Sequence, residues 1–249
     1  MVTAAVTCPF GIAAICYNTP RMKFSEDIRG AIRIGLASAR ANFVPIIVLW
    51  AMAAALVGAY YLLAPFREVL EPVADWHRQW GWKSAFASQA VFCGLLPGLF
   101  QLTIRGIRPR CPYLTILAET LWCGMFGIAV NVLFVRLAQL FGNDANWTTL
   151  LLKTLVDQFV WTFLVVAPAN AVFYFWVGRD FSIIRLRREW PSDFLDKVLL
   201  PNLVANWCVW IPACLAVFAF PLGLQLYLNG LICAFWTLMC VQIGVRSGR

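Results

Sequence analysis

Long, uninterrupted apolar stretches dominate the sequence. Each is about 20 residues long, the length at which an α-helix crosses the hydrocarbon core of a bilayer, and Gly, Pro or charged residues mark the breaks. A strand of an outer-membrane barrel would instead alternate polar and apolar positions over about ten residues. The pattern therefore predicts an all-α, polytopic helical membrane bundle with about six spanning segments, at 43–64, 84–104, 114–141, 152–177, 199–220 and 222–244.

The fifth and sixth stretches leave room only for a tight turn between them. They meet at residues 220–223, where the sequence reads Phe-Pro-Leu-Gly. A re-entrant fifth segment would produce a similar pattern. The sequence alone thus leaves open whether 199–220 crosses the bilayer or turns back.

An amphipathic helix is predicted before the first stretch. Apolar residues there recur every four positions while the arginines fall on other faces, at Phe24, Ile28, Ile32 and Leu36. Such a helix is typical of segments that lie on a membrane surface, and the alternative is an extra soluble helix packed on the loops. We therefore divide the chain into a cytoplasmic tail with an interfacial helix (1–42) and a single transmembrane domain (43–245).

Composition excludes a soluble domain, and it therefore changes how the positive net charge of the chain is interpreted. The chain is 61% apolar and 13% charged, whereas soluble domains have about 45–50% apolar and about 25% charged residues. Its net charge of +8 would suggest a nucleic-acid partner in a soluble protein. In a membrane protein, Lys and Arg bind loops to the anionic cytoplasmic leaflet, so we expect membrane lipids and no nucleic acid as partners.

The basic residues also predict the topology. With six spans and a cytoplasmic N-terminus, fifteen Lys and Arg fall on the inner side and four on the outer side. This bias favours both termini inside. It favours a bacterial cytoplasmic membrane, with the mitochondrial inner or peroxisomal membrane as alternatives, because Glu26 and Asp27 are atypical of a mitochondrial transit peptide.

Residues that commonly carry catalysis or bind metals are few. The nine cysteines contain no C-x-x-C pair and lie mostly in apolar stretches, which is typical of small buried side chains. Cys111 and the single histidine, His77, are expected in loops without catalytic partners. We therefore predict no enzyme activity, no catalytic residues, no metal site and no cofactor.

Polar residues inside the stretches provide the functional signal. Three stretches each carry a pair of polar residues one helical turn apart, at Lys153 and Asp157, Asn202 and Asn206, and Gln225 and Asn229. A charge near the bilayer centre costs about 2.5–3.5 kcal/mol and must therefore face protein or water. In the fourth stretch Asp157 is expected on one face with Lys153 and Trp161, whereas Gln158 is expected to point elsewhere.

Two interpretations of these pairs remain open. The polar side chains either line a path through the membrane or bond spanning helices to each other, each such bond being worth about 1 kcal/mol. Lys153 and Asp157 form either a structural ion pair or a pair at the mouth of a pore. In the third stretch a stripe of small residues predicts close helix packing, at Gly124, Gly127, Asn131 and Ala138.

Several motifs of the second half keep the order and spacing of a known family. They are Lys153 with Asp157 and Gln158, Trp190 with Pro191, Asn206 with Trp207 and Trp210, and finally Pro221 and Trp236. In these residues the region 114–245 resembles the Mpv family, which includes the peroxisomal membrane protein of twenty-two kilodaltons. It departs from the family at Pro212, one place beyond the signature proline, and at Gln225, where the family has arginine.

The resemblance implies a pore for small solutes in a bundle that is usually described with four spans. We therefore predict a channel for small polar solutes or ions, lined by Lys153, Asp157, Asn206, Gln225 and Asn229. The alternative is a non-conducting membrane scaffold in which the same residues only bond helices together. A homo-oligomer is compatible with either function.

Overall fold

The described part of the chain is helical almost throughout. The computed structural model describes residues 24–103, 110–191, 194–195 and 199–247, and these contain no β-strand. The unstructured or interfacial tail predicted at the N-terminus lies mostly outside the described residues. So do several of the basic residues that predict the topology, namely Arg21, Lys23, Arg105, Arg108, Lys197 and Arg249.

Five described segments are long and apolar enough to cross a membrane. They are α2 (Phe43–Leu62), α4 (Trp82–Gln89) with η1 (Ala90–Leu95) and α5 (Leu96–Thr103), α6 (Pro112–Phe141), α7 (Trp147–Leu155) with η2 (Val156–Val166) and α8 (Ala167–Val177), and α10 (Leu200–Ala219). They coincide with the first five predicted stretches. The prediction of an all-α membrane bundle is confirmed.

The sixth predicted stretch forms α11 (Leu222–Ser247). The helix has 26 residues, and its side chains are described as far as Thr237. Only Phe220 and Pro221 separate it from α10, so the tight turn is as predicted. The preceding helix α10 has 20 residues without a break, which corresponds to about 30 Å and fits a full crossing rather than a re-entrant segment.

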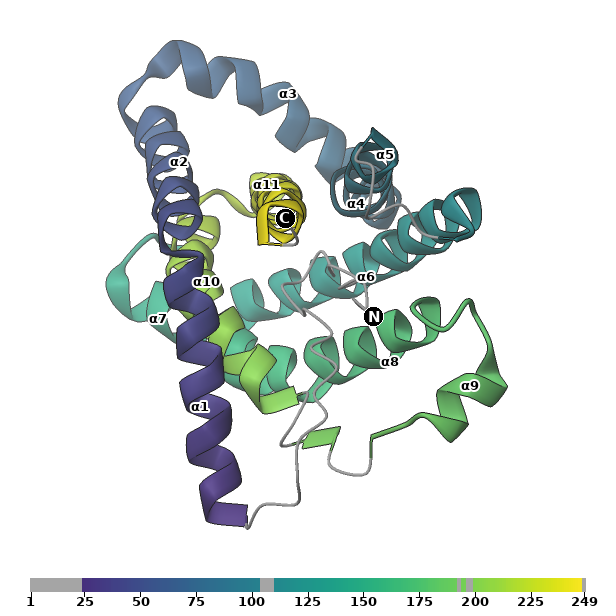
Figure 1. Ribbon diagram of the computed structural model, residues 1–249. Helices are drawn as coiled ribbons and strands as arrows, with labels where there is room; N and C mark the ends of the chain where they lie inside the picture. Colours follow the sequence, from purple (N-terminus) through teal and green to yellow (C-terminus); the bar gives the residue numbers. More distant parts are fainter. Residues whose placement is uncertain (1–23, 104–109, 192–193, 196–198, 248–249) are drawn as a thin grey trace.

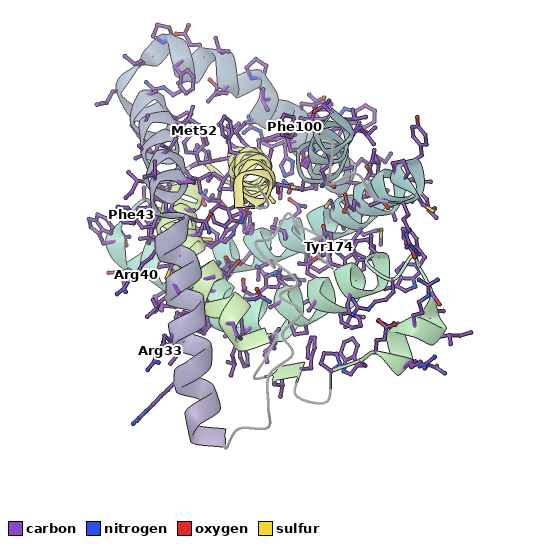
Figure 2. The ribbon with its side chains drawn as sticks, in the orientation of Figure 1. Arg33, Arg40, Phe43, Met52, Phe100 and Tyr174 are labelled. Carbon is purple, nitrogen blue, oxygen red and sulfur yellow. The ribbon has the colours of Figure 1, made fainter. Side chains whose placement is uncertain are left out.

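Helix α11 occupies the centre of the molecule. Figure 1 shows α11 along its axis, with α2, α3 (Ala64–Trp80), α6 and α10 around it. Ile232 and Cys233 of α11 are fully buried. In Figure 2, Met52 of α2 lies on the side of α2 that faces α11, and it packs against the main apolar core.

Contacts between helix ends agree with a topology in which successive spans cross the membrane in opposite directions. The Tyr61 hydroxyl at the end of α2 donates to Ala219 O at the end of α10, over 2.6 Å. Before α6 and after α8, Arg110 pairs with Asp180 at 3.2 Å. The segment ends that share one side of the predicted topology are therefore also neighbours in space.

Helix α1 (Phe24–Ala41) packs on the first half of α10. A Cβ atom on Gly35 would lie 2.6 Å from Val204 Cβ, so only glycine allows this close approach. Of the predicted apolar stripe, Ile32 and Leu36 are 42% and 41% exposed, so these two side chains face away from α10. Figure 2 shows Arg33 and Arg40 pointing away from the rest of the chain. The position of α1 on the cytoplasmic leaflet stays a prediction.

The segment between the first two spans is helix α3 and not a loop, which corrects the prediction for His77. Pro65 stands in the first turn of α3, where the missing N–H costs nothing. Ala74 and His77 are buried, and Ala74 contacts Gly223 of α11. The amphipathic pattern of 64–80 therefore reflects packing on α11.

Two of the spanning segments contain π-helices. In η1 the Leu96 N–H donates to Val91 O, and in η2 the Ala167 N–H donates to Thr162 O, each five residues back. Each π-helix ends just before a proline, Pro97 or Pro168. Because a proline ring clashes with the carbonyl four residues earlier and supplies no N–H, it favours such widened turns.

The stripe of small residues on α6 has the predicted packing role. A Cβ atom on Gly124 would lie 2.6 Å from the Phe86 ring, and one on Gly127 would lie 2.6 Å from Ala85 O. Both contacts join α6 to α4. The close approach predicted from this stripe is confirmed.

Candidate functional site

A small, partly open cavity with several polar side chains in its wall lies among four of the helices. Its volume is about 50 Å³, which is room for about three water molecules. The polar lining comes from η2, α10 and α11, and apolar residues of α6 complete the wall. The lining residues are Val130, Phe134, Asp157, Gln158, Trp161, Thr162, Val166, Asn206, Trp210, Cys214 and Asn229.

The π-helix explains how η2 supplies five of these residues. Asp157 and Val166 are nine residues apart, which is two and a half turns of an α-helix and would place them on opposite faces. The wider π turn brings both to the cavity. It also brings Gln158 there, so the expectation that Gln158 points away from Asp157 is wrong.

Asp157 is held by its neighbours and not by a lysine. Gln158 Nε2 donates to Asp157 Oδ2 at 2.8 Å, and Cys214 Sγ donates to the same oxygen at 3.2 Å. Among the described side chains, no ion pair joins Asp157 to Lys153. The carboxyl group is 7% exposed and borders the cavity.

Gln158 connects two helices at the cavity. Its Oε1 accepts from Asn206 Nδ2 at 3.3 Å, and its backbone oxygen accepts from Trp207 Nε1 at 3.1 Å. Its Nε2 also donates to Cys214 Sγ at 3.2 Å. Asp157, Gln158 and Asn206 therefore form a continuous hydrogen-bonded chain from η2 to α10.

Two tryptophans on the cavity wall have free hydrogen-bond donors. The indole N–H groups of Trp161 and Trp210 are buried and have no partner within the described structure. A buried donor without a partner costs about 1–3 kcal/mol.

Lys153 and Gln225, predicted to line a pore, lie away from this cavity. Lys153 is 1% exposed; its Nζ lies 3.4 Å from Asn143 Oδ1 and 5.9 Å from the centre of the Phe218 ring. Gln225 Nε2 donates to Phe220 O at 2.8 Å in the turn before α11. Of the five predicted residues, Asp157, Asn206 and Asn229 line the cavity.

The residues that carry the family resemblance fall into two groups, one at the cavity and one elsewhere in the structure. Asp157, Gln158, Asn206, Trp207 and Trp210 gather at or beside the cavity. The others lie apart: Trp190 contacts Phe175 and Phe194, Pro221 O accepts from Leu224 N, and Trp236 is buried on α11.

A second polar network, where α3 meets α4 and α6, was not predicted. The His77 Nε2 lies 3.0 Å from Asn131 Oδ1, and its Nδ1 lies 2.7 Å from Ser84 Oγ. Ser84 and His77 are 1% and 8% exposed, so a substrate cannot reach the hydroxyl in this conformation. The network joins α3, α4 and α6. Burial lowers the pKa of His77, and the hydrogen bond to Asn131 partly opposes this.

A buried acid and two cysteines complete the polar interior. Glu119 of α6 is 2% exposed, and its Oε1 has no partner in the described chain. Cys93 donates to Gln89 Oε1 at 3.0 Å, and Cys214 bonds Asp157. These cysteines therefore take part in hydrogen bonds as well as in packing. No three metal-ligating side chains gather among the described residues.

Comparison of the chain with family models, curated proteins and solved structures found no significant match. The resemblance to the Mpv family therefore stays a prediction from motif order and spacing.

Proposed function

We propose that this integral membrane protein conducts small polar solutes or ions across the bilayer, with the Asp157 cavity as the narrow part of the path. One observation carries the proposal. Side chains from three different helices, Asp157, Asn206 and Asn229, reach the same cavity inside the spanning region. Polar groups in a membrane interior are expensive, and their convergence on one space is typical of a solute path.

The chemistry of the wall supports a hydrogen-bonding solute. The carboxylate of Asp157 is an acceptor, and the side-chain amides of Asn206 and Asn229 both donate and accept. Water and small hydroxylated solutes both donate and accept hydrogen bonds, and they fit this set. With about 50 Å³ of space, larger solutes require the cavity to widen.

A membrane scaffold is the second candidate, and specific contacts favour it. Gln158 bonds both Asp157 and Asn206, while Lys153 and Gln225 are sealed in contacts with a loop and a turn. In that function the polar residues hold helices together and no solute passes.

Flux measurements on reconstituted protein distinguish the two functions. Wild type in proteoliposomes should pass glycerol or small ions faster than empty liposomes. Asp157→Asn removes a charge at constant size, so it should reduce cation over anion selectivity several-fold. Glu71→Gln, which neutralises an exposed carboxylate on α3, should leave selectivity unchanged.

Failure of folded, reconstituted protein to conduct would overturn the channel proposal. The scaffold function instead predicts that Asp157→Asn lowers the melting temperature in detergent with no change in flux. Membership of the Mpv family and a bacterial cytoplasmic location are parts of the same proposal, supported by the motifs around the cavity and by the basic inner loops.

A further inference from the structure

An apolar groove lies at the inner end of the bundle, on the side opposite the His77 network in the predicted topology. Its volume is about 480 Å³, within the usual range of ligand pockets. It runs between α6, α8 and the short helix α9 (Ile183–Arg188). The lining residues are Trp122, Ala169, Val172, Phe173, Trp176, Ile183 and Leu186.

The floor of the groove is apolar and aromatic, and the unpartnered indole N–H of Trp176 is buried below its surface. The rings of Trp122 and Phe173 stack with centroids 4.4 Å apart. The indole N–H of Trp122 donates to Asn170 Oδ1 at 2.8 Å, so this donor is already satisfied. Only an apolar occupant gains from such a surface, and within the spanning region a lipid acyl chain is that occupant.

The rim of the groove is strongly basic. Asp180 accepts from both Arg110 and Arg185, at 3.2 and 2.9 Å, and Arg179 pairs with Glu189 at 3.2 Å. These contacts use both acidic residues of the loop. Arg187 and Arg188 are exposed and form no ion pair with any described residue.

Of the two arginines, Arg187 is on the side of α9 nearer the groove. It stands one turn after Ile183, which lines the groove with Leu186, whereas Arg188 lies on nearly the opposite face. The start of α9 is fixed because Ser182 Oγ accepts from Arg185 N at 3.3 Å. In the predicted topology this end lies on the inner side, where the anionic lipids of the cytoplasmic leaflet are found.

We infer that this groove binds one anionic phospholipid, with an acyl chain against Trp122 and Phe173 and the phosphate at Arg187. A zwitterionic lipid fills the apolar part equally well but gains less from this unpaired charge. A basic pocket beside spanning helices on the cytoplasmic side is a suitable environment for an anionic headgroup. The inference does not depend on solute conduction.

Native mass spectrometry of the full-length protein in neutral detergent tests the site. Phosphatidylglycerol should bind more tightly than phosphatidylcholine with the same acyl chains. Arg187→Gln should weaken phosphatidylglycerol binding about fivefold, which is the contribution of one arginine near an anionic headgroup. Arg67→Gln removes the same charge on the predicted outer side and should leave binding unchanged.

Two further measurements separate the groove from a simple phosphate site. Ala169→Phe fills the groove and should abolish lipid binding while Arg187 remains. Glycerol phosphate, which has no acyl chain, should not compete at concentrations that saturate the lipid site. Equal binding of the two lipids, or full competition by glycerol phosphate, would overturn the inference.

Discussion

Gln158 and Gln225 are the same residue type and both are buried in the bundle, but they bind different partners. Gln158 connects Asp157 to Asn206 beside a cavity, whereas Gln225 bonds the carbonyls of the turn before α11. Lys153 lies one helical turn from Asp157 in the sequence, but its Nζ reaches Asn143. A long, flexible lysine side chain can reach several acceptors, so spacing alone does not determine its partner.

His77 gives a pH dependence with a definite sign. Burial lowers its pKa in the folded protein, so the unfolded chain binds more protons below the ordinary value of about 6.5. Stability is therefore complete above that pH and falls as the pH decreases through it, by at most about 1.4 kcal/mol per pH unit.

The difference in apparent melting temperature between wild type and His77→Gln, measured between pH 5 and 8, checks this prediction. The chain has one histidine, and the difference separates its contribution from that of buried acids such as Glu119. The neighbours Ser84, Asn131 and Tyr227 are uncharged at these pH values. A melting temperature that falls no more on acidification in wild type than in His77→Gln would contradict the argument.

At the scale of the helix, backbone geometry determines which side chains meet. The π-helix η2 turns Asp157, Gln158 and Val166 to one cavity, although an α-helix would separate the first from the last. Pro168 stands near its end, inside an apolar stretch, and is the signal from which a widened turn could have been expected. On α6, glycines replace side chains at the contact with α4.

Gly127→Ala should destabilise the protein, although alanine is the better helix former. Its Cβ would lie 2.6 Å from Ala85 O and 2.7 Å from Gln89 Cβ, and such overpacking costs about 1–3 kcal/mol. Thermal unfolding in detergent measures the change. Gly58→Ala on α2 is the matched control, because nothing lies within 4 Å of its new Cβ.

The control should be neutral or stabilised by up to about 1 kcal/mol through helix propensity. Equal effects of the two substitutions would mean that the contact between α4 and α6 is not as tight as described.

At the scale of the whole molecule, the main feature is that successive spanning segments run in opposite directions. Contacts at the two ends, Tyr61 with Ala219 and Arg110 with Asp180, join segments that an alternating topology places on the same side. Basic residues predict which side is cytoplasmic. The helices form a single bundle around α11 (Figure 1).

This topology can be tested with a membrane-impermeant maleimide. Cys111 stands just before α6 and is exposed. It should react with the reagent more strongly in inverted vesicles than in intact cells. Labelling of the Cys111→Ser variant measures the background from the other cysteines. Ala145→Cys, in the exposed loop between α6 and α7, should show the opposite preference. Labelling of both positions from the same side would contradict the alternation.

The sequence by itself determined the membrane class, the positions of the spans and the close packing at Gly124 and Gly127. These properties are local. The free energy of transfer into the membrane adds up residue by residue along a segment, and a glycine allows close packing at its own position because it has no Cβ atom. Tertiary structure decided the rest. It determined that Gln158 faces Asp157, that Lys153 does not, and that His77 is buried between Ser84 and Asn131. Such contacts depend on how each helix is rotated about its axis and on which helices pack against it. The residue order of one segment does not specify either property.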